Sequence, residues 1–168
     1  MFTVVSPLRQ EMAVAEAEPS KECGGLVSEL IALASFIKEL ETQAHLIHLN
    51  YEGENFLSVH ELLKAQYEAH LEQFDATAEF VRAMDAFMPM CACGLKEVAT
   101  CFQNVESYDG KQMLVTYLMN LDTLIDKATE VEAWAGRERC VDVQNYMADL
   151  VASANKNSWF IKATLRGC

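Results

Sequence analysis

Residues that form tight turns are scarce in this sequence of 168 residues, which contains only 3 prolines and 7 glycines. Few turns leave room for a few long elements, and that favours helices over a sheet of many short strands. No apolar run approaches the roughly 18 residues of a membrane-spanning helix. The opening segment Met1–Pro7 lacks the basic start and long apolar core of a secretory signal. We therefore expect a cytoplasmic protein made of long helices.

Basic residues are also scarce, since 13 Lys and Arg stand against 25 Asp and Glu and give a net charge of −12. A general nucleic-acid binder needs a basic surface that displaces counterions from phosphates, so DNA binding is not expected. Residues 1–22 are expected to form an amino-terminal tail. It contains Arg9 and Lys21 but more acidic residues, so a lysine-rich DNA-binding arm is missing. An acidic surface suits cations, including iron.

The six cysteines are expected to be reduced thiols, as is usual in the cytoplasm. Cys91-Ala-Cys93 together with Cys101 offers three thiolate ligands for zinc. Their spacing matches no common zinc-site pattern, and no histidine lies nearby in the sequence. Buried or loop thiols are therefore the preferred interpretation, with a structural zinc site as the alternative.

Apolar residues recur at steps of three and four along most of the chain, and this spacing predicts amphipathic helices. The first long helix is expected to follow Gly24-Gly25, with an apolar stripe from Leu26 to Ile47. Further helices are expected at about 55–84, 111–135 and 141–165, with a short one at about 95–105. The core stripe expected on the second helix consists of Phe56, Val59, Leu63, Tyr67, Leu71, Phe74, Ala78 and Val81.

Together these elements predict an all-α protein, because the four long helices account for most of the chain. The link between the second and third long helices is long and carries the short helix. A four-helix bundle with one such crossover is the arrangement of ferritin-like folds. We expect one domain of this kind at residues 23–168, following the tail at residues 1–22.

Two histidines and two carboxylates form the most informative motif of the chain. His48 and His60 stand 12 residues apart, and Asp75 and Glu79 follow on the second helix. Nitrogen and oxygen ligands of these kinds hold iron. At about 1.5 Å per residue, an unbroken helix separates His60 from Asp75 by roughly 22 Å, so both cannot touch one ion within one chain. A shared ion would need a second copy running antiparallel, which indicates a symmetric oligomer with metal sites at its interfaces.

The sequence contains no Glu-x-x-His pair, the ligand motif of classical di-iron bundles. A different pattern is present: His48…Gly53-Glu-Asn-Phe56…His60-Glu…Tyr67…Asp75-Ala-Thr-Ala78-Glu79. Later segments add Leu95-Lys-Glu in the crossover, Asp142 at the start of the last helix and Lys156-Asn-Ser-Trp159 near its end. Over about residues 25–165 the chain thereby resembles the Dps family, the DNA-binding proteins from starved cells, also called miniferritins.

The resemblance implies a hollow dodecamer that acts as a ferroxidase. It would bind ferrous iron at twofold interfaces, oxidise it with hydrogen peroxide or oxygen, store the ferric product in its cavity and so protect against oxidative stress. His48 and His60 would come from one subunit, and Asp75 and Glu79 from its twofold mate, with Glu79 bridging. Asp142, Asn145 and Asp149 would line a threefold pore that admits iron.

Several positions depart from the family pattern, and Lys64 is the most consequential. It stands one helical turn after His60, where the family has a carboxylate. An ammonium group has no acceptor atom and repels cations, so a second iron position would be weakened. Lys64 could instead pair with a nearby carboxylate such as Glu61 or Glu68. Leu49 replaces a tryptophan, and Asn145 stands where an acidic residue is usual.

Two alternatives to an iron-oxidising cage stay open. The first is a cage of the same architecture whose site Lys64 has disabled or reduced to a single metal, acting in metal sequestration or structurally. The second is a helical interaction module without enzymatic activity. Zinc competes with iron for sites built from histidine and carboxylate. His45 and His70 are expected to face solvent or a subunit contact, with His45 as a secondary metal contact in the alternative.

Overall fold

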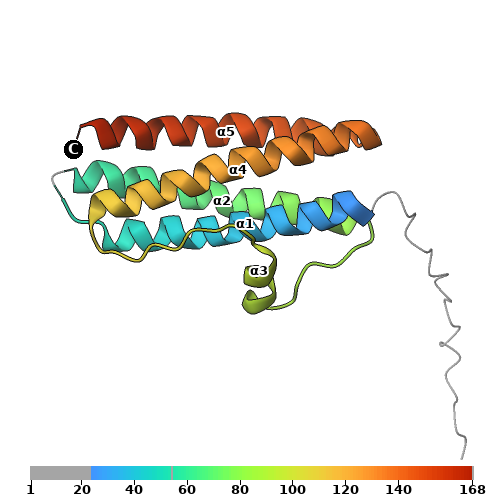
Figure 1. The fold of residues 1–168 in the computed structure, drawn as a ribbon, viewed down its shortest axis with the longest axis horizontal. Helices are drawn as coiled ribbons and strands as arrows, with labels where there is room; N and C mark the ends of the chain where they lie inside the picture. The colour runs from blue at the N-terminus through green and yellow to red at the C-terminus, as the bar shows by residue number, and fades with distance from the viewer. Residues whose placement is uncertain (1–23, 54, 168) are drawn as a thin grey trace, which may run out of the picture.

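A computed structural model describes residues 24–53 and 55–167 of the chain. The predicted tail at residues 1–22, and its boundary with the domain, lie outside the described residues. Within the described segments the regular structure is entirely helical (Figure 1). The helices are α1 (Gly24–Asn50), α2 (Phe56–Ala83), α3 (Ala92–Val98), α4 (Gly110–Glu138) and α5 (Val141–Arg166). The prediction of four long helices and one short helix is confirmed.

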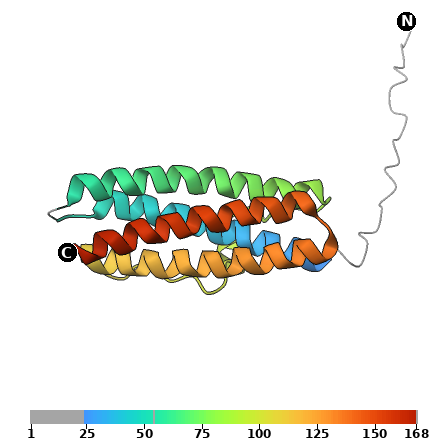
Figure 2. The same cartoon turned by 90° about the horizontal axis from the view of Figure 1, so that it is seen from above.

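The four long helices form a bundle of two antiparallel hairpins, α1–α2 and α4–α5 (Figures 1 and 2). Helix α1 packs against α2 and α4, and α5 packs against α4 and α2. Helices α2 and α4 therefore face each other across a diagonal of the bundle. The segment from α2 to α4 returns along the full length of the bundle and carries α3 on its outside (Figure 1). This is the crossover predicted for a ferritin-like fold.

Helix α1 buries the stripe that its spacing predicts. Side chains at steps of three and four residues are at most 2% exposed and face the other long helices. They are Leu26, Leu30, Leu33, Ile37, Leu40, Ala44 and Ile47. Each fully buried leucine or isoleucine contributes about 1.5–3 kcal/mol relative to an exposed one, so this face anchors the bundle.

Helix α2 buries a different face from the one that its apolar residues predict. Its buried side chains are Val59, Leu63, Gln66, His70, Thr77 and Val81. Leu71 is 52% exposed and Phe56 is 44% exposed. The predicted stripe is thus wrong in its middle, because polar residues occupy the core face and several apolar residues lie outside it. An apolar outer face is typical of a helix that has a further packing partner.

The crossover is fixed by the side chain of Asn120, which is buried on α4. Its Oδ1 accepts from the Gln103 amide at 2.9 Å, and its Nδ2 donates to the Gln103 carbonyl at 2.8 Å and to Gln43 Oε1 at 2.9 Å. Gln43 of α1 completes the network by donating to the same Gln103 carbonyl at 2.8 Å. Backbone groups of the crossover are therefore paired with side chains of α1 and α4 rather than with a helix of their own.

Two predicted boundaries differ from the structure. The short helix lies at Ala92–Val98 instead of 95–105, because the Cys91 side chain caps its first turn by accepting from the Gly94 amide at 3.3 Å. Helix α4 continues through Gly136 to Glu138, where a connection had been predicted. It ends at Arg139, whose left-handed backbone has a φ of 61°.

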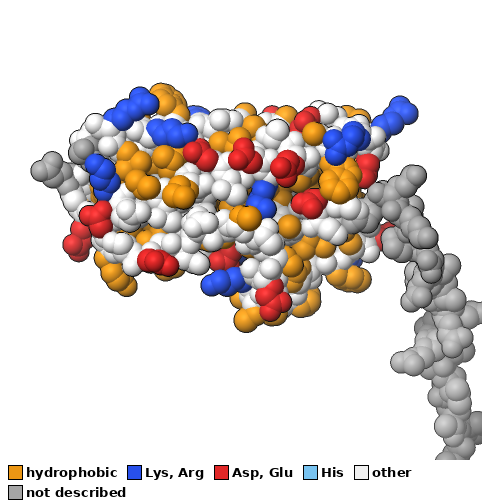
Figure 3. All heavy atoms as spheres, in the orientation of Figure 1, with side chains coloured by type: hydrophobic (Ala, Val, Ile, Leu, Met, Phe, Trp, Pro, Cys, Tyr) orange, Lys and Arg blue, Asp and Glu red, His pale blue; other side chains and the backbone are white. Residues whose placement is uncertain are grey.

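None of the helices in the described part of the chain is long and apolar enough to span a membrane. On the face seen in Figure 3, acidic side chains lie along the bundle, and hydrophobic side chains gather around the protruding α3. In the segment between α2 and α3, Met90 is 97% exposed and Phe87 is 76% exposed.

Candidate metal centre

The two motif histidines face each other at one end of the bundle. His48 lies in the last turn of α1 and His60 in the second turn of α2, on either side of the turn that joins the helices. Gly53 in that turn has a φ of 150°, a conformation that other residues rarely adopt. The two imidazole rings stack with centroids 3.7 Å apart and an angle of 20° between their planes.

Each histidine is bound to the backbone of the other. His48 Nδ1 lies 2.8 Å from the His60 carbonyl oxygen, and His60 Nδ1 lies 3.0 Å from the His48 carbonyl oxygen. A carbonyl oxygen can only accept, so in both rings Nδ1 carries the hydrogen. In the neutral rings Nε2 is then unprotonated and has a free lone pair. This is the tautomer that binds metals, held in place by the hydrogen bond at the other nitrogen.

Aromatic side chains support the histidine pair. The Tyr67 ring lies 5.4 Å from the His48 ring in an edge-on arrangement and stacks on the His45 ring at 4.2 Å. Phe56 lies 5.2 Å from His60. His48 is 7% exposed, whereas His60 is half-buried and His45 is exposed, as expected. The pair is therefore packed from behind and reaches the surface on the His60 side.

The motif carboxylates do not lie beside the histidines of their own chain. Asp75 and Glu79 are exposed on α2, which runs without a break from His60 past both of them. Fifteen residues of helix separate His60 from Asp75 by about 22 Å. Across the part of the chain that the structure describes, no three His, Cys, Asp or Glu side chains gather closely enough to hold a metal. One chain alone thus carries the two halves of the predicted site at separate places.

Those two halves share one face of α2. Lys64, Leu71 and Asp75 follow His60 at 4, 11 and 15 residues, spacings that return to the same side of a helix. All three are exposed. Lys64 forms no ion pair with any of the described residues, so the predicted pairing with Glu61 or Glu68 is not formed. Its ammonium group stands on the surface one turn from His60.

Several large apolar side chains near the histidine pair are exposed. Four of them lie within a few residues of His48 or His60 in the sequence and are 44–68% exposed. They are Leu46, Leu49, Phe56 and Leu57. Exposed large apolar side chains are frequent where a second protein surface covers them.

His70 was predicted to face solvent or a subunit contact, and that prediction is wrong. Its side chain is fully buried, with Nε2 2.9 Å from the Tyr117 hydroxyl and Nδ1 2.8 Å from Gln73 Oε1. Burial lowers the pKa of His70 to about 4, against the smaller opposing effects of Gln73 and of the charge on Glu41. The signal in the sequence was its spacing from Leu63, which puts it on the core face.

The predicted pore residues lie on α5. Asp142 is in its first turn, where its charge suits the helix dipole, and Asn145 and Asp149 follow along the helix. All three are exposed, so they are free to line a channel between subunits. That role stays a prediction.

The thiols of Cys91, Cys93 and Cys101 are free and exposed. Cys91 and Cys101 lie outside the helices, as loop thiols would, whereas Cys93 is an exposed residue of α3. They form no metal-holding group of three in the described segments.

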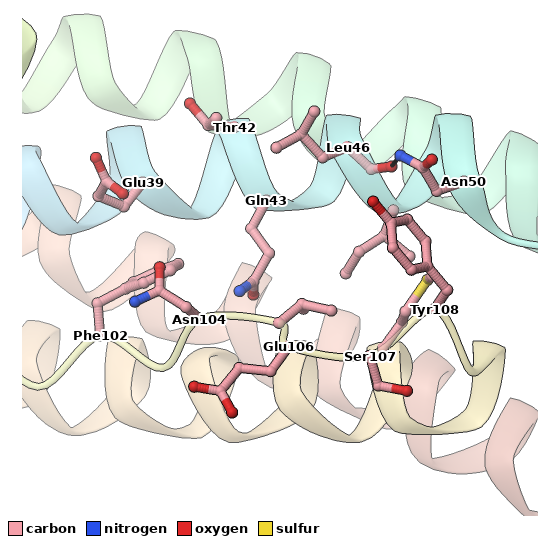
Figure 4. Close-up of a pocket in the computed structure, with 13 residues that line it drawn as sticks. Glu39, Thr42, Gln43, Leu46, Asn50, Phe102, Asn104, Glu106, Ser107 and Tyr108 are labelled. Carbon is pink, nitrogen blue, oxygen red and sulfur yellow. Dashed lines mark hydrogen bonds between the residues drawn. The ribbon is translucent and has the colours of Figure 1, made fainter.

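A groove of about 430 Å³ lies between α1 and the crossover (Figure 4). Glu39, Gln43 and Leu46 border it from α1, and Phe102, Glu106 and Tyr108 from the crossover. Gln43 donates to the Gln103 carbonyl, so one polar side chain that lines the groove already forms a hydrogen bond with the crossover. Neither His48 nor His60 lines this groove, which is therefore separate from the candidate metal centre.

Comparison with known proteins supports the architecture. The model of the family described as the ferritin-like domain matches residues 33–168. An uncharacterized protein of Haemophilus influenzae is 20% identical over 143 residues, which cover 85% of this chain and 89% of the relative.

Solved structures of Dps proteins have the same fold. Dps from Thermosynechococcus elongatus superposes with a TM-score of 0.82 at 19% identity, covering 86% of this chain and 92% of that protein. Dps from Vibrio cholerae, described as a member of a broad superfamily of ferritin-like diiron-carboxylate proteins, gives 0.80 at 19% identity, with 86% and 91% covered. The resemblance predicted from the sequence is thus confirmed for the fold.

Proposed function

The chain belongs to the ferritin-like family, and we propose that it is the subunit of a Dps-like cage that binds and oxidises ferrous iron between subunits. The observation that carries this proposal is the reciprocally bonded pair His48 and His60. Both rings are held by Nδ1 hydrogen bonds that leave Nε2 available, and the pair reaches the surface on the His60 side, near exposed apolar side chains. A purely structural histidine pair has no need of that surface position.

The missing oxygen ligands come from a second copy in this proposal. If two α2 helices lie antiparallel across a twofold axis, Asp75 and Glu79 of each copy approach His48 and His60 of the other. The exposed apolar side chains around the histidines, together with Leu71 between them and Asp75, supply contact area for this pairing. A twofold contact alone joins two subunits, and the proposed dodecamer combines it with the threefold contacts at which the pore lies.

Ferrous iron is the substrate of the proposed reaction. The imidazole nitrogens and the carboxylate oxygens match the ligands that iron takes in proteins. Electrons pass from the iron to hydrogen peroxide or oxygen, and the ferric product is stored in the cavity. Asp142, Asn145 and Asp149 line the threefold pore that admits the ion, with a lower negative potential than three acidic residues would give.

Lys64 limits this site to a single iron. Two unit charges about 4 Å apart repel by about 4 kcal/mol at an effective dielectric constant near 20, and a divalent ion doubles that before solvent screening. The free ammonium group of Lys64 therefore disfavours a second ion on the His60 side. This observation also favours the second candidate function, a cage that sequesters metal, zinc included, without rapid oxidation.

The proposal is tested by adding ferrous iron to the metal-free protein and following ferric absorbance with and without peroxide. The double variant His48→Ala/His60→Ala is expected to lose rapid oxidation, because both nitrogen ligands are gone. Light scattering and circular dichroism should show an intact assembly, since packing between subunits is mainly apolar.

His45→Ala is the matched control, because it removes a neighbouring exposed imidazole that is not a proposed ligand. It should oxidise iron at close to the parent rate. If the double variant keeps the parent rate, the histidine pair is not the site of oxidation. If the parent protein binds iron but does not oxidise it faster than buffer does, sequestration is the function.

A further inference from the structure

A chain of hydrogen bonds crosses the centre of the bundle from α4 to α5. Tyr117 on α4 is completely buried, and its hydroxyl lies 2.9 Å from His70 Nε2 on α2. His70 Nδ1 lies 2.8 Å from Gln73 Oε1, and Gln73 Nε2 donates to Ser153 Oγ on α5 at 3.3 Å. Gln73 and Ser153 line an open groove of about 370 Å³, together with Glu72 and Asp149. None of these residues is a proposed iron ligand.

The direction of each hydrogen bond follows from the groups present. The amide oxygen of Gln73 can only accept, so His70 Nδ1 carries the hydrogen and Nε2 is an acceptor. The Tyr117 hydroxyl must then donate to His70. Burial raises the pKa of Tyr117 and lowers that of His70, so the pair rests as a neutral phenol beside a neutral base. This arrangement suits a phenol that loses an electron and a proton together.

Tyr67 stands on α2 between His60 of the candidate metal centre and His70 of the buried pair. The Tyr67 ring lies 5.4 Å from that of His48. Tyr67 and His70 are three residues apart on α2, about one helical turn. An oxidisable ring that contacts His48 is thus placed one turn of helix from His70. The His70 ring in turn contacts the Tyr117 ring edge-on, with centroids 6.3 Å apart.

A site that holds one ferrous ion cannot supply both electrons that the reduction of hydrogen peroxide needs. One ferrous ion gives one electron, whereas reducing hydrogen peroxide to two hydroxide ions takes two. We propose that Tyr117, with His70 as its proton acceptor, donates the second electron. This inference rests on the proposed function and on the exclusion of a second ion by Lys64.

The O–O bond of peroxide breaks, one electron comes from ferrous iron and one from Tyr117, and two hydroxide ions form. The phenolic proton moves to His70 Nε2, which leaves a neutral tyrosyl radical, an imidazolium and ferric iron. The charge on Glu41 favours the imidazolium. The next ferrous ion returns an electron to the radical, the proton returns from His70, and the pair is reset.

Rapid-freeze electron paramagnetic resonance on the assembled full-length protein tests this. Ferrous iron is loaded without oxygen, hydrogen peroxide is added, and the spectrum is recorded within the first turnover. A tyrosyl radical is expected in the parent protein. Tyr117→Phe should reduce that signal at least tenfold and should increase the yield of spin-trapped hydroxyl radical several-fold, because the second electron is no longer available within the protein.

Tyr146→Phe is the matched control, because Tyr146 is a partly buried tyrosine with a raised pKa whose hydrogen-bond partner is Thr77 rather than a base. It should keep the parent signal. His70→Gln is the second variant, which leaves Tyr117 in place but removes the proton acceptor, and it should lower the radical yield as much as Tyr117→Phe does. Circular dichroism checks that each variant is folded.

The outcomes separate the two proposals. Rapid iron oxidation in the parent protein without a radical, or with a radical that persists in Tyr117→Phe, would overturn the role of Tyr117 and leave the proposed function standing. Absence of iron oxidation in the parent protein would overturn the proposed function and this inference with it. A radical that is lost in Tyr117→Phe and in His70→Gln, but not in Tyr146→Phe, supports the inference.

Discussion

We expect a single lysine, Lys64, to set how many ions the proposed centre holds. Lys64→Asp is expected to replace a repelling ammonium group by a carboxylate at the same exposed position, one turn from His60. Iron titration should then show two ions per site in place of one, and oxidation by peroxide should be several-fold faster. Isothermal titration and stopped-flow absorbance measure the two effects.

The control for this variant is Lys96→Asp, which makes the same charge change at an exposed position on α3. It should leave the stoichiometry at one. Two tight irons per site in the parent protein would contradict our interpretation, since Lys64 would then have to turn away from the ion.

His70 makes the stability of the fold depend on pH. Its pKa is about 4 in the folded chain against an ordinary value of 6.5, so below pH 6.5 the unfolded chain binds a proton that the folded chain does not. Stability contributed by neutral His70 is thus fully present above pH 6.5 and is lost as the pH falls towards 4. The difference corresponds to about 3 kcal/mol.

Denaturant unfolding at a series of pH values measures this dependence. His70→Gln keeps a polar group at the position but cannot titrate, so its stability should fall less than that of the parent between pH 6.5 and 4. The difference between the two curves isolates His70 from the other histidines. Parallel curves would mean that His70 is not shielded from solvent in the folded protein.

At the scale of elements, Asn120 links the crossover to the bundle. Asn120→Leu keeps a similar volume but removes three hydrogen bonds and leaves buried partners unpaired. The expected cost is about 2–4 kcal/mol of unfolding free energy. Hydrogen exchange should become faster at residues 99–109, whose backbone this side chain holds. Asn155→Leu is the control, because Asn155 is exposed and bonds only within α5; it should change stability little.

The spacing of apolar residues predicts the buried face of a helix well where only one face of that helix is apolar. Every residue of the predicted α1 stripe is buried, because that helix packs on its neighbours through one face. For helix α2 the same periodicity predicts the wrong buried face, since Gln66 and His70 are buried while Leu71 is exposed. A sequence cannot show which of two apolar faces belongs to the core when the other belongs to a partner. The hydrogen bond between His70 and Tyr117 cannot be predicted from the sequence either, because Tyr117 is 47 residues away.

The crossover could not be predicted in detail for a related reason. Its conformation depends on the amide network of Gln43, Gln103 and Asn120, which joins positions distant in the sequence. The metal motif was easier to place. Its spacing already shows that His60 and Asp75 lie too far apart for one ion, and the unbroken α2 bears out that geometry. Sharing of a metal between copies stays a prediction.

At the scale of the whole molecule, assembly and charge can be tested together. We expect twelve chains of 18.8 kDa to assemble into a closed cage of about 226 kDa, which light scattering should report. The net charge of −12 on every chain should prevent tight binding to duplex DNA at physiological salt. A stable monomer in solution would refute the intersubunit site. Retardation of DNA in a gel without added divalent metal would refute the second expectation.

The bond between Tyr117 and His70 has a further consequence for the topology of the bundle. Helices α2 and α4 lie on a diagonal of the bundle, and the hydrogen bond between Tyr117 and His70 joins them directly. If either helix slid by one turn, a phenol and an imidazole would both be left unpaired in the core, at a cost of about 1–3 kcal/mol each. Apolar side chains tolerate such sliding far better, because one leucine can replace another. The hydrogen-bonded pair therefore favours one axial register between the two hairpins. The apolar stripes alone would allow several registers.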